Sequence, residues 1–267
     1  MKTRIDALIG AIAGDIIGSP YEFNGLTDVA RFKPFGMHSR YTDDTVLSVA
    51  VAEWLSNPGT PLQDYLVRYA RTYYWVGYGG MFLRWSRKRN PQPYNSFGNG
   101  SAMRVSAVGC WANDVEEAMQ LAEESALPTH NHPEGIKGAQ AIAVAVVLAR
   151  QGKSKEEIKT ELLRLFDYDL NLSYEDLLKK GYAFHVTCQE TVPPALVCFF
   201  DSNSYEECIV KAMLTNKDTD TAAAVAGAVA GAFYGIPETI REEALAHLPK
   251  ELKAVIDNFE ALLTKEA

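Results

Sequence analysis

The chain has 267 residues, of which 47% are hydrophobic and 22% charged, and its 26 basic and 34 acidic side chains give a formal net charge of −8. A chain of this length can bury roughly 75% of the surface that its unfolded form exposes, so a stable core requires no disulfide or structural metal. The acidic balance excludes a surface that coats nucleic acid or anionic membranes, because phosphate binding normally requires a concentrated basic face.

Cysteine usage and the N-terminus favour a reducing compartment. The chain has neither a Cys-x-x-Cys pair nor a histidine at zinc-finger spacing from its cysteines, which are Cys110, Cys188, Cys198 and Cys208. Asp6 interrupts the apolar stretch that a secretory signal needs. The small-residue run over 219–237 predicts a packed interior helix rather than a membrane span. We therefore expect a cytoplasmic globular protein without a membrane partner.

Helical periodicity dominates the chain. Apolar side chains recur at helical spacing in residues 5–17, 45–55, 62–75, 115–127 and 136–149. Ser154-x-x-Glu157 and Ser204-x-x-Glu207 read as capping boxes, and His132 is placed to cap the helix that begins at Pro133. Strand alternation is nearly absent and no repeat of fixed period is visible. The sequence predicts a single all-α domain over residues 1–267, with about a dozen helices.

Two segments depart from the helical pattern. Residues 19–41 and 77–100 are rich in glycine, proline or aromatic side chains, and long irregular stretches are often functional. The second segment ends in Gly98-Asn99-Gly100, which suits either a tight turn with glycine at positive φ or close approach to a ligand. We expect a functional site beside these two segments.

Two acidic clusters stand at predicted helix starts, Tyr41-Thr42-Asp43-Asp44-Thr45 and Asp218-Thr219-Asp220-Thr221. Either cluster alone is explained by helix capping, because threonine or aspartate accepts backbone N–H groups and acids suit the positive helix end. Together they offer carboxylates and hydroxyls, the hard ligands that suit Mg²⁺ or Mn²⁺, whereas the absence of a Cys/His set disfavours zinc. Glu22, in the first irregular segment, is either a further site carboxylate or a solvated loop acid.

Five motifs in a fixed order, spanning about residues 5–240, resemble the ADP-ribosylglycohydrolase family, which includes dinitrogenase reductase-activating glycohydrolase and the ADP-ribosyl-acceptor hydrolases. The motifs are Gly14-Asp15-Ile16-Ile17-Gly18 with Glu22, Tyr41-Thr42-Asp43-Asp44-Thr45, Gly98-Asn99-Gly100-Ser101-Ala102-Met103-Arg104, Thr129-His130-x-His132-Pro133-Glu134-Gly135 and Asp218-Thr219-Asp220-Thr221.

The resemblance implies a compact orthogonal helical domain with two bound Mg²⁺ or Mn²⁺ ions. The implied metal ligands are Thr42, Asp43, Asp44, Asp218, Asp220 and Thr221, with Asp220 bridging. The implied catalytic residues are Glu22, Asp43 and Asp220, and Glu22 would swing aside when substrate enters. The implied substrate-binding residues are Gly98, Asn99, Gly100, Ser101, Met103 and His130.

The implied reaction is hydrolysis at C1″ of the distal ribose of an α-linked ADP-ribosyl group, with release of ADP-ribose from a protein side chain or small acceptor. The cations would bind the 2″ and 3″ hydroxyls and position a water, with Glu22 or a metal-site aspartate as general base. Nucleic acid is expected as a partner only when it is itself ADP-ribosylated. Two alternatives stay open: a non-catalytic ADP-ribose-binding or structural protein on the same fold, and a metal-dependent phosphohydrolase of ADP-ribose.

Three places depart from the family's usual pattern. Asn216-Lys217 stands where two glycines are usual, His185 where a bacterial subfamily commonly has aspartate, and Glu190-Thr191 where that subfamily has Gly-Ser. The resemblance places the 181–193 loop near the nucleotide end of the substrate. These differences therefore bear on substrate preference.

Two further groups are assigned mainly to structure. The basic cluster is expected to be a solvated helix end rather than a surface that steers a diphosphate; it comprises Arg84, Arg87, Lys88 and Arg89. Most members of an aromatic group at near-helical spacing are expected in the core; the group comprises Tyr69, Tyr73, Tyr74, Trp75 and Tyr78.

Overall fold

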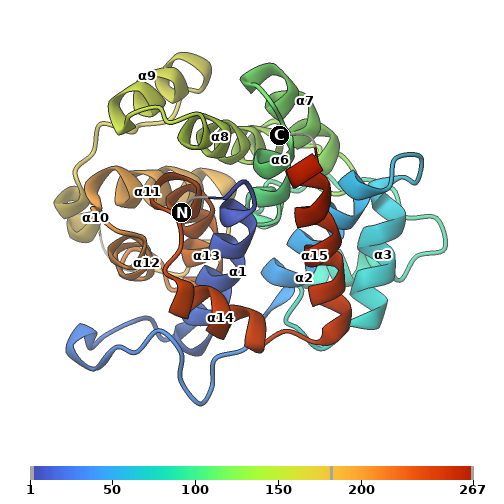
Figure 1. The fold of residues 1–267 in the computed structure, drawn as a ribbon, viewed down its shortest axis with the longest axis horizontal. Coiled ribbons are helices and arrows are strands. Elements are labelled where there is room, and N and C mark those ends of the chain that lie inside the picture. The colour runs from blue at the N-terminus through green and yellow to red at the C-terminus, as the bar shows by residue number, and fades with distance from the viewer. Residues whose placement is uncertain (1–2, 181–182, 266–267) are drawn as a thin grey trace.

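The computed structural model describes residues 3–180 and 183–265. Within these ranges the chain forms fifteen α-helices and two short 3₁₀ helices, and no β-strand is present (Figure 1). The predicted all-α fold is therefore confirmed. The described residues contain one isolated antiparallel bridge, between Gly98 and Thr187.

The elements follow in this order: α1 (Asp6–Gly18), η1 (Ser19–Tyr21), η2 (Val29–Arg31), α2 (Asp43–Ser56), α3 (Leu62–Thr72), α4 (Gly80–Ser86), α5 (Gly100–Met103), α6 (Ser106–Trp111), α7 (Val115–Ala126), α8 (Pro133–Arg150), α9 (Lys155–Leu165), α10 (Tyr174–Lys180), α11 (Cys188–Asp201), α12 (Tyr205–Met213), α13 (Thr219–Tyr234), α14 (Glu238–Ala246) and α15 (Lys250–Lys265).

Helices α1 and α13 form the centre of the fold. Every residue of α1 is buried, and so is α13 from its start through Ala232. Small residues let the two backbones touch: a Cβ added to Gly10 would lie 2.3 Å from the carbonyl oxygen of Gly227. At the other end of α1, the Thr219 hydroxyl donates to the Gly18 carbonyl oxygen at 2.8 Å. This packing fixes the start of α13 beside the end of α1.

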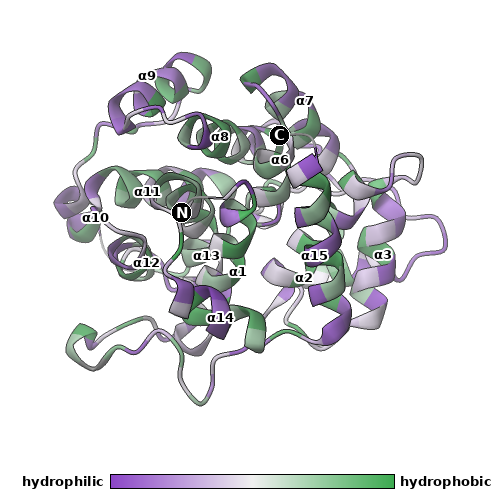
Figure 2. Cartoon of the chain, in the orientation of Figure 1, coloured by the Kyte–Doolittle hydropathy of each residue, from purple (hydrophilic) through white to green (hydrophobic). Residues whose placement is uncertain are grey.

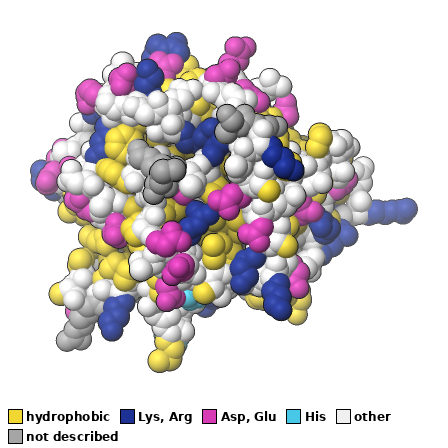
Figure 3. Space-filling view, in the orientation of Figure 1, with side chains coloured by type: hydrophobic (Ala, Val, Ile, Leu, Met, Phe, Trp, Pro, Cys, Tyr) yellow, Lys and Arg dark blue, Asp and Glu magenta, His cyan; other side chains and the backbone are white. Residues whose placement is uncertain are grey.

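The other helices surround this central pair. Helix α2 packs on α1 and α15, whereas α8, α11 and α12 pack on α13 (Figure 1). Peripheral helices α3 and α9 are largely hydrophilic, as Figure 2 shows, because one side of each meets water. Acidic and basic side chains are interspersed over the face drawn in Figure 3, without a continuous basic patch on that face.

The helix predicted to reach Trp75 ends at Thr72. The chain then turns toward the start of α2, where the Asp43 N–H donates to the Val76 carbonyl oxygen at 3.1 Å. This early end leaves Tyr74 and Trp75 68% and 60% exposed, so these two are the members of the aromatic group that lie outside the core. The other three aromatic residues of the group are buried as predicted; they are Tyr69, Tyr73 and Tyr78.

The predicted helix caps are present, with one difference. The Ser154-x-x-Glu157 capping box is complete, and the side chain of His132 caps α8. At the start of α12, Ser204 accepts the N–H of Glu207, but the Glu207 carboxylate accepts from the N–H of Asn203 at 2.6 Å. Only half of the second capping box is therefore formed.

Residues 19–41 are irregular apart from η1 and η2, as predicted, whereas 77–100 also contains α4. The apolar side chains Phe82 and Trp85 of α4 are buried, which explains why this glycine-rich stretch is helical. All four cysteines are free and buried. Among the described helices, none has both the length and the apolar character that crossing a membrane would require.

Candidate active site

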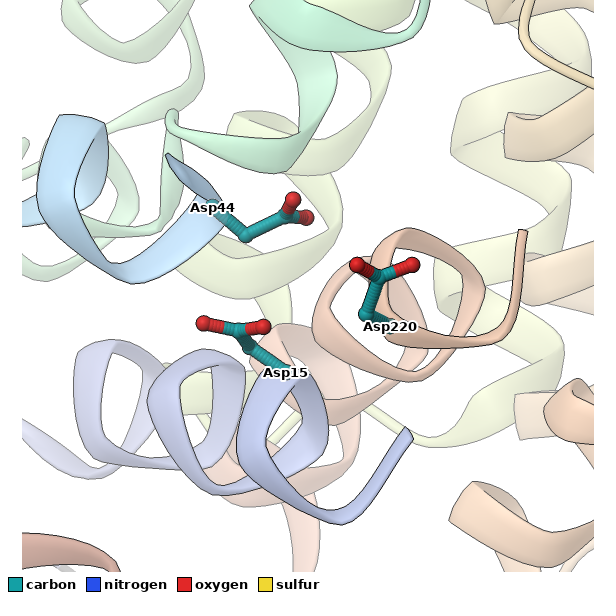
Figure 4. A group of neighbouring side chains, drawn as sticks. All are labelled: Asp15, Asp44 and Asp220. Carbon is teal, nitrogen blue, oxygen red and sulfur yellow. The ribbon is translucent and has the colours of Figure 1, made fainter. Parts of the chain in front are cut away.

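The two acidic clusters, at helices that begin at Asp43 and Thr219, meet at one place in the fold. The N-terminal ends of α2 and α13 lie beside the last turn of α1, and the carboxylates of Asp44, Asp220 and Asp15 turn toward a common point (Figure 4). Carboxylate oxygens of these three residues lie within 4.8 Å of one another, and so do those of Glu22, Asp218 and Asp220. Asp220 belongs to both groups and joins them into one acidic centre.

Asp15 organises the start of α2. Its carboxylate accepts the backbone N–H groups of Thr42 at 2.9 Å and Thr45 at 3.1 Å, the Thr42 hydroxyl at 2.7 Å, and the Thr45 hydroxyl. These bonds satisfy donors that the first turn of a helix leaves without intrahelical partners. Sequence reasoning included Asp15 in a motif but assigned it no role. The sequence did contain an indication of such a role, because Asp15 is the one acid in the second half of an apolar helix.

The remaining oxygens of the acidic centre are only partly satisfied. Asp44 Oδ2 accepts the Thr221 hydroxyl at 3.3 Å and lies 3.3 Å from the Thr42 hydroxyl, which donates its proton to Asp15. The buried Oδ1 of Asp44 has no hydrogen-bond partner among the described residues. Asp218 Oδ2 accepts Asn99 Nδ2 at 2.7 Å. A buried carboxylate oxygen without a donor is costly, and a cation would relieve that cost.

Burial and mutual repulsion favour protons or cations at this centre. Burial raises the pKa of Asp44 and of Asp220 well above the usual range, and neighbouring carboxylates raise both further. Burial also raises the pKa of Asp43 to about 8 and of Glu22 to about 7, again with help from nearby acids. For Asp15, burial raises the pKa to about 6 although hydrogen bonds from threonines oppose the shift.

A cavity of about 580 Å³ opens over the acidic centre. Most of the predicted site residues line it: Glu22, Asp43, Asp44, Gly98, Asn99, Gly100, Met103, His130, Asp218, Asp220 and Thr221. Sequence reasoning did not assign several other lining residues to the site, including Phe23, Gly77, Gly79, Gly80, Phe184 and Val186. Phe23 and the glycines at 77–80 lie in the two segments expected to flank a site, and Phe184 and Val186 lie in the loop that the resemblance places near the substrate. None of these residues was singled out individually.

Two predicted site residues do not line the cavity. The Thr42 hydroxyl faces Asp15 and Asp44, behind the pocket wall. Ser101 is fully buried and its hydroxyl donates to the Gly135 carbonyl oxygen at 2.7 Å, so it ties α5 to α8. The members of the basic cluster differ in position: Arg84 lines the cavity, whereas Arg87, Lys88 and Arg89 do not.

The glycine turn packs closely against His130. A Cβ on Gly100 would lie 3.1 Å from both Cε1 and Nε2 of His130, and neither Gly98 nor Gly100 has positive φ. Close approach, rather than left-handed backbone, therefore explains the glycines. Burial, reinforced by the charge of Arg104, lowers the pKa of His130 well below its usual value, so the imidazole is neutral. Its Nδ1 pairs with the Thr129 hydroxyl at 2.7 Å.

Comparisons with known proteins agree with this geometry. A family model described as ADP-ribosylglycohydrolase matches residues 3–267. ADP-ribosylhydrolase ARH3 of Homo sapiens is 28% identical, over 86% of this chain and 85% of that protein. ADP-ribosyl-(dinitrogen reductase) glycohydrolase of Rhodospirillum rubrum is 26% identical, over 88% and 86%.

Two further proteins match this chain over most of its length. ADP-ribosylarginine hydrolase Tri1 of Pseudomonas putida is 25% identical, over 94% of this chain and 77% of that protein. A solved structure, described as an ADP-ribosylglycohydrolase-related protein complex, superposes with a TM-score of 0.74 and 25% identity over 97% of both chains. The chain belongs to the ADP-ribosylglycohydrolase family and is an enzyme of that family.

Proposed function

We propose that this enzyme hydrolyses the glycosidic bond at C1″ of an ADP-ribosyl group and releases ADP-ribose. The acceptor would be a protein side chain or a small molecule. The observation that carries the proposal is a pair of acidic clusters beneath a cavity of about 580 Å³. One cluster comprises Asp15, Asp44 and Asp220, the other comprises Glu22, Asp218 and Asp220, and Asp220 is common to both. That volume lies within the range of typical small-molecule sites, and the relatives named above are hydrolases of ADP-ribosyl groups.

The donor set suits two Mg²⁺ or Mn²⁺ ions. All candidate ligands present oxygen, and the unpartnered Oδ1 of Asp44 is a ready ligand atom. In this proposal Thr42, Asp43 and Asp44 would hold the ions from one side of the centre, and Asp218, Asp220 and Thr221 from the other. Bound cations would supply orientation of the ribose hydroxyls and activation of water.

Glu22 is our candidate for the general base. It is half-buried at the cavity, and one of its carboxylate oxygens lies within 4.8 Å of oxygens of Asp218 and Asp220, so it is placed to accept a proton from a water held there. In the proposed step, Glu22 takes a proton from the water that attacks C1″. The bond from C1″ to the acceptor breaks, and the acceptor leaves with that electron pair and a proton. Asp43 and Asp220 are alternatives for the same role because both line the cavity.

The substrate would lie against the glycine turn and His130. Gly98, Asn99, Gly100 and Met103 line the cavity beside that neutral imidazole. Asn99 also binds Asp218 and therefore links the proposed substrate wall to the proposed metal site. Four buried free thiols suit the reducing cytoplasm that we expect for this enzyme.

The test is release of ADP-ribose by wild type and Asp220→Asn in buffers of defined metal content. We expect the variant to lose at least about 100-fold in kcat because it loses the shared ligand. Asp114→Asn, at the exposed cap of α7, is the matched control and should retain wild-type activity. Full turnover by Asp220→Asn would refute the metal assignment. AMP as the product would indicate a phosphohydrolase, and binding without turnover would indicate a non-catalytic binder.

The acceptor is addressed by the same assay. Arginine-, serine-, nucleobase- and acetyl-linked ADP-ribose share the half of the substrate that this site would hold. A panel of these four substrates, each with Mg²⁺ and with Mn²⁺, therefore identifies the linkage and the metal.

A further inference from the structure

A short stretch, residues 183–187, forms a wall of the acidic cavity, and we call it the wall segment. Its Phe184 and Val186 line that cavity, whereas His185 lines a second cavity of about 480 Å³. A segment with a hollow on each side receives little packing support. Its position therefore depends on the hydrogen bonds that it makes with neighbouring elements.

The C-terminal end of the wall segment is held by the isolated antiparallel bridge. The Asn99 N–H donates to the Val186 carbonyl oxygen at 2.8 Å, and the Cys188 N–H donates to the Phe97 carbonyl oxygen at 2.9 Å. These backbone bonds attach this end to the glycine turn. They do not reach residues 183–185.

The N-terminal end of the wall segment is held by Asn216-Lys217. The amide of Asn216 pairs with the backbone of His185: Oδ1 accepts the N–H at 3.0 Å, and Nδ2 donates to the carbonyl oxygen at 2.9 Å. The Lys217 N–H donates to the Ala183 carbonyl oxygen at 2.9 Å. Asn216 is 2% exposed, so water cannot easily replace its bonds.

The same amide also reaches the acidic centre. Asn216 Oδ1 accepts the N–H of Asp218 at 3.0 Å. One side chain therefore joins the wall segment to a proposed metal ligand. Alanine or glycine at position 216 offers none of these three bonds.

The wall segment in turn contacts the loop that carries Glu22. Phe184 stacks on Phe23, with ring centroids 5.0 Å apart and planes at 28°. Phe23 has a φ of +68° and its N–H donates to the Lys217 carbonyl oxygen at 2.8 Å. The two rings are 63% and 41% exposed, for Phe23 and Phe184 respectively, so their contact lies at the mouth of the cavity rather than in the core.

We propose that Asn216 is a positioning residue that holds the N-terminal end of the wall segment, and with it Phe184, over the mouth of the acidic cavity. The wall then meets Phe23 and through it supports the loop that carries Glu22 beside the cavity. The effect on substrate binding rests on the function proposed above. The effect on the wall segment itself does not.

Hydrogen exchange of Asn216→Ala and His185→Ala, read by mass spectrometry or NMR, tests the structural part. Asn216 bonds to the backbone of His185 and not to its side chain, so His185→Ala keeps these bonds and removes only the contact of His185 Nδ1 with Glu190 Oε1 at 3.3 Å. The His185 substitution should therefore leave the wall segment in place. In Asn216→Ala, the amides of His185 and Lys217 should exchange at least about tenfold faster. The Cys188 amide should not change, because the antiparallel bridge remains. Unchanged exchange at His185 and Lys217, or equal acceleration in both variants, would overturn the proposal.

Steady-state kinetics and calorimetry with ADP-ribose test the functional part. We expect KM of Asn216→Ala and its Kd for ADP-ribose to rise about tenfold, with kcat changed by less than about threefold, since Asn99 still holds Asp218. A fall in kcat with unchanged KM would contradict this role. If the alanine variant does not fold, both measurements are made on Asn216→Gly, which carries the residue that is usual in the family at this position. If wild type neither binds nor releases ADP-ribose, the proposed function fails while the exchange result still decides the role of Asn216.

Discussion

Replacing Gly14 by alanine tests whether the contact between α1 and α13 positions the acidic centre. A Cβ at Gly14 would lie 2.2 Å from the carbonyl oxygen of Ala223, 2.5 Å from its carbonyl carbon and 2.9 Å from the nitrogen of Ala224. All three atoms belong to backbone, so no side chain can rotate away. The two helices must therefore separate by about 1 Å to restore ordinary van der Waals distances.

Two opposing effects determine the stability of this variant. Alanine in a helix interior is favoured over glycine by about 1 kcal/mol, whereas forcing apart a packed interface typically costs about 1–3 kcal/mol and sometimes more. Since every clashing atom of this interface is backbone, we expect the cost to dominate, with a net loss of about 1–3 kcal/mol in the free energy of unfolding.

The same separation should reduce activity. Gly14 precedes Asp15, and Asp220 stands in the first turn of α13, so moving the helices apart moves these carboxylates apart. A displacement near 1 Å in a catalytic arrangement can cost about 100-fold in rate. The assays are urea unfolding and ADP-ribose release. Gly36→Ala is the control, because no atom lies within 4 Å of the added Cβ. If Gly14→Ala is as stable and active as wild type, the reasoning is refuted.

Two further predictions concern charge. Burial raises the pKa of Asp15 to about 6 and of Asp43 to about 8, so the metal-free folded protein binds protons more tightly than the unfolded chain. The stability from protonation is complete below about pH 4 and is lost as pH rises through these values, so Mg²⁺ should raise Tm more at pH 8 than at pH 5. Equal increases in Tm would contradict a cation at this centre. Separately, Arg84→Glu should weaken ADP-ribose binding about three- to tenfold, because Arg84 lines the cavity, whereas Arg87→Glu should not. Equal Kd values for the two variants in calorimetry would show that Arg84 does not face the ligand.

Much of the secondary structure and part of the site are predictable from consecutive residues. Apolar spacing identified the helices around residues 5–17 and 136–149 because burying one face, or all faces, of a helix leaves a pattern in its own residues. The two acidic motifs stand at helix starts for an equally local reason, since Thr42 caps α2 and Asp218 precedes α13.

Local pattern failed where a neighbour distant in sequence decides the outcome. Nothing beside Trp75 in the sequence shows that the chain must turn toward α2, so the helix was predicted to reach Trp75 although it ends at Thr72. Ser101 belongs to a glycine-rich motif, yet its hydroxyl faces Gly135 because α5 packs on α8. Among four neighbouring basic residues, only the packing of α4 determines that Arg84 lines the cavity.

The sequence alone determined the helical class, the oxygen character of the candidate metal ligands and the two segments that flank the site, since each depends on residue types or on short spacings. The tertiary structure decided how these parts combine. Asp15 organises a helix that begins 28 residues later, at Asp43, and Asn216 holds a wall segment 31 residues earlier in the chain. Such pairings depend on how the helices pack, because only that packing brings segments that are distant in sequence within hydrogen-bond distance.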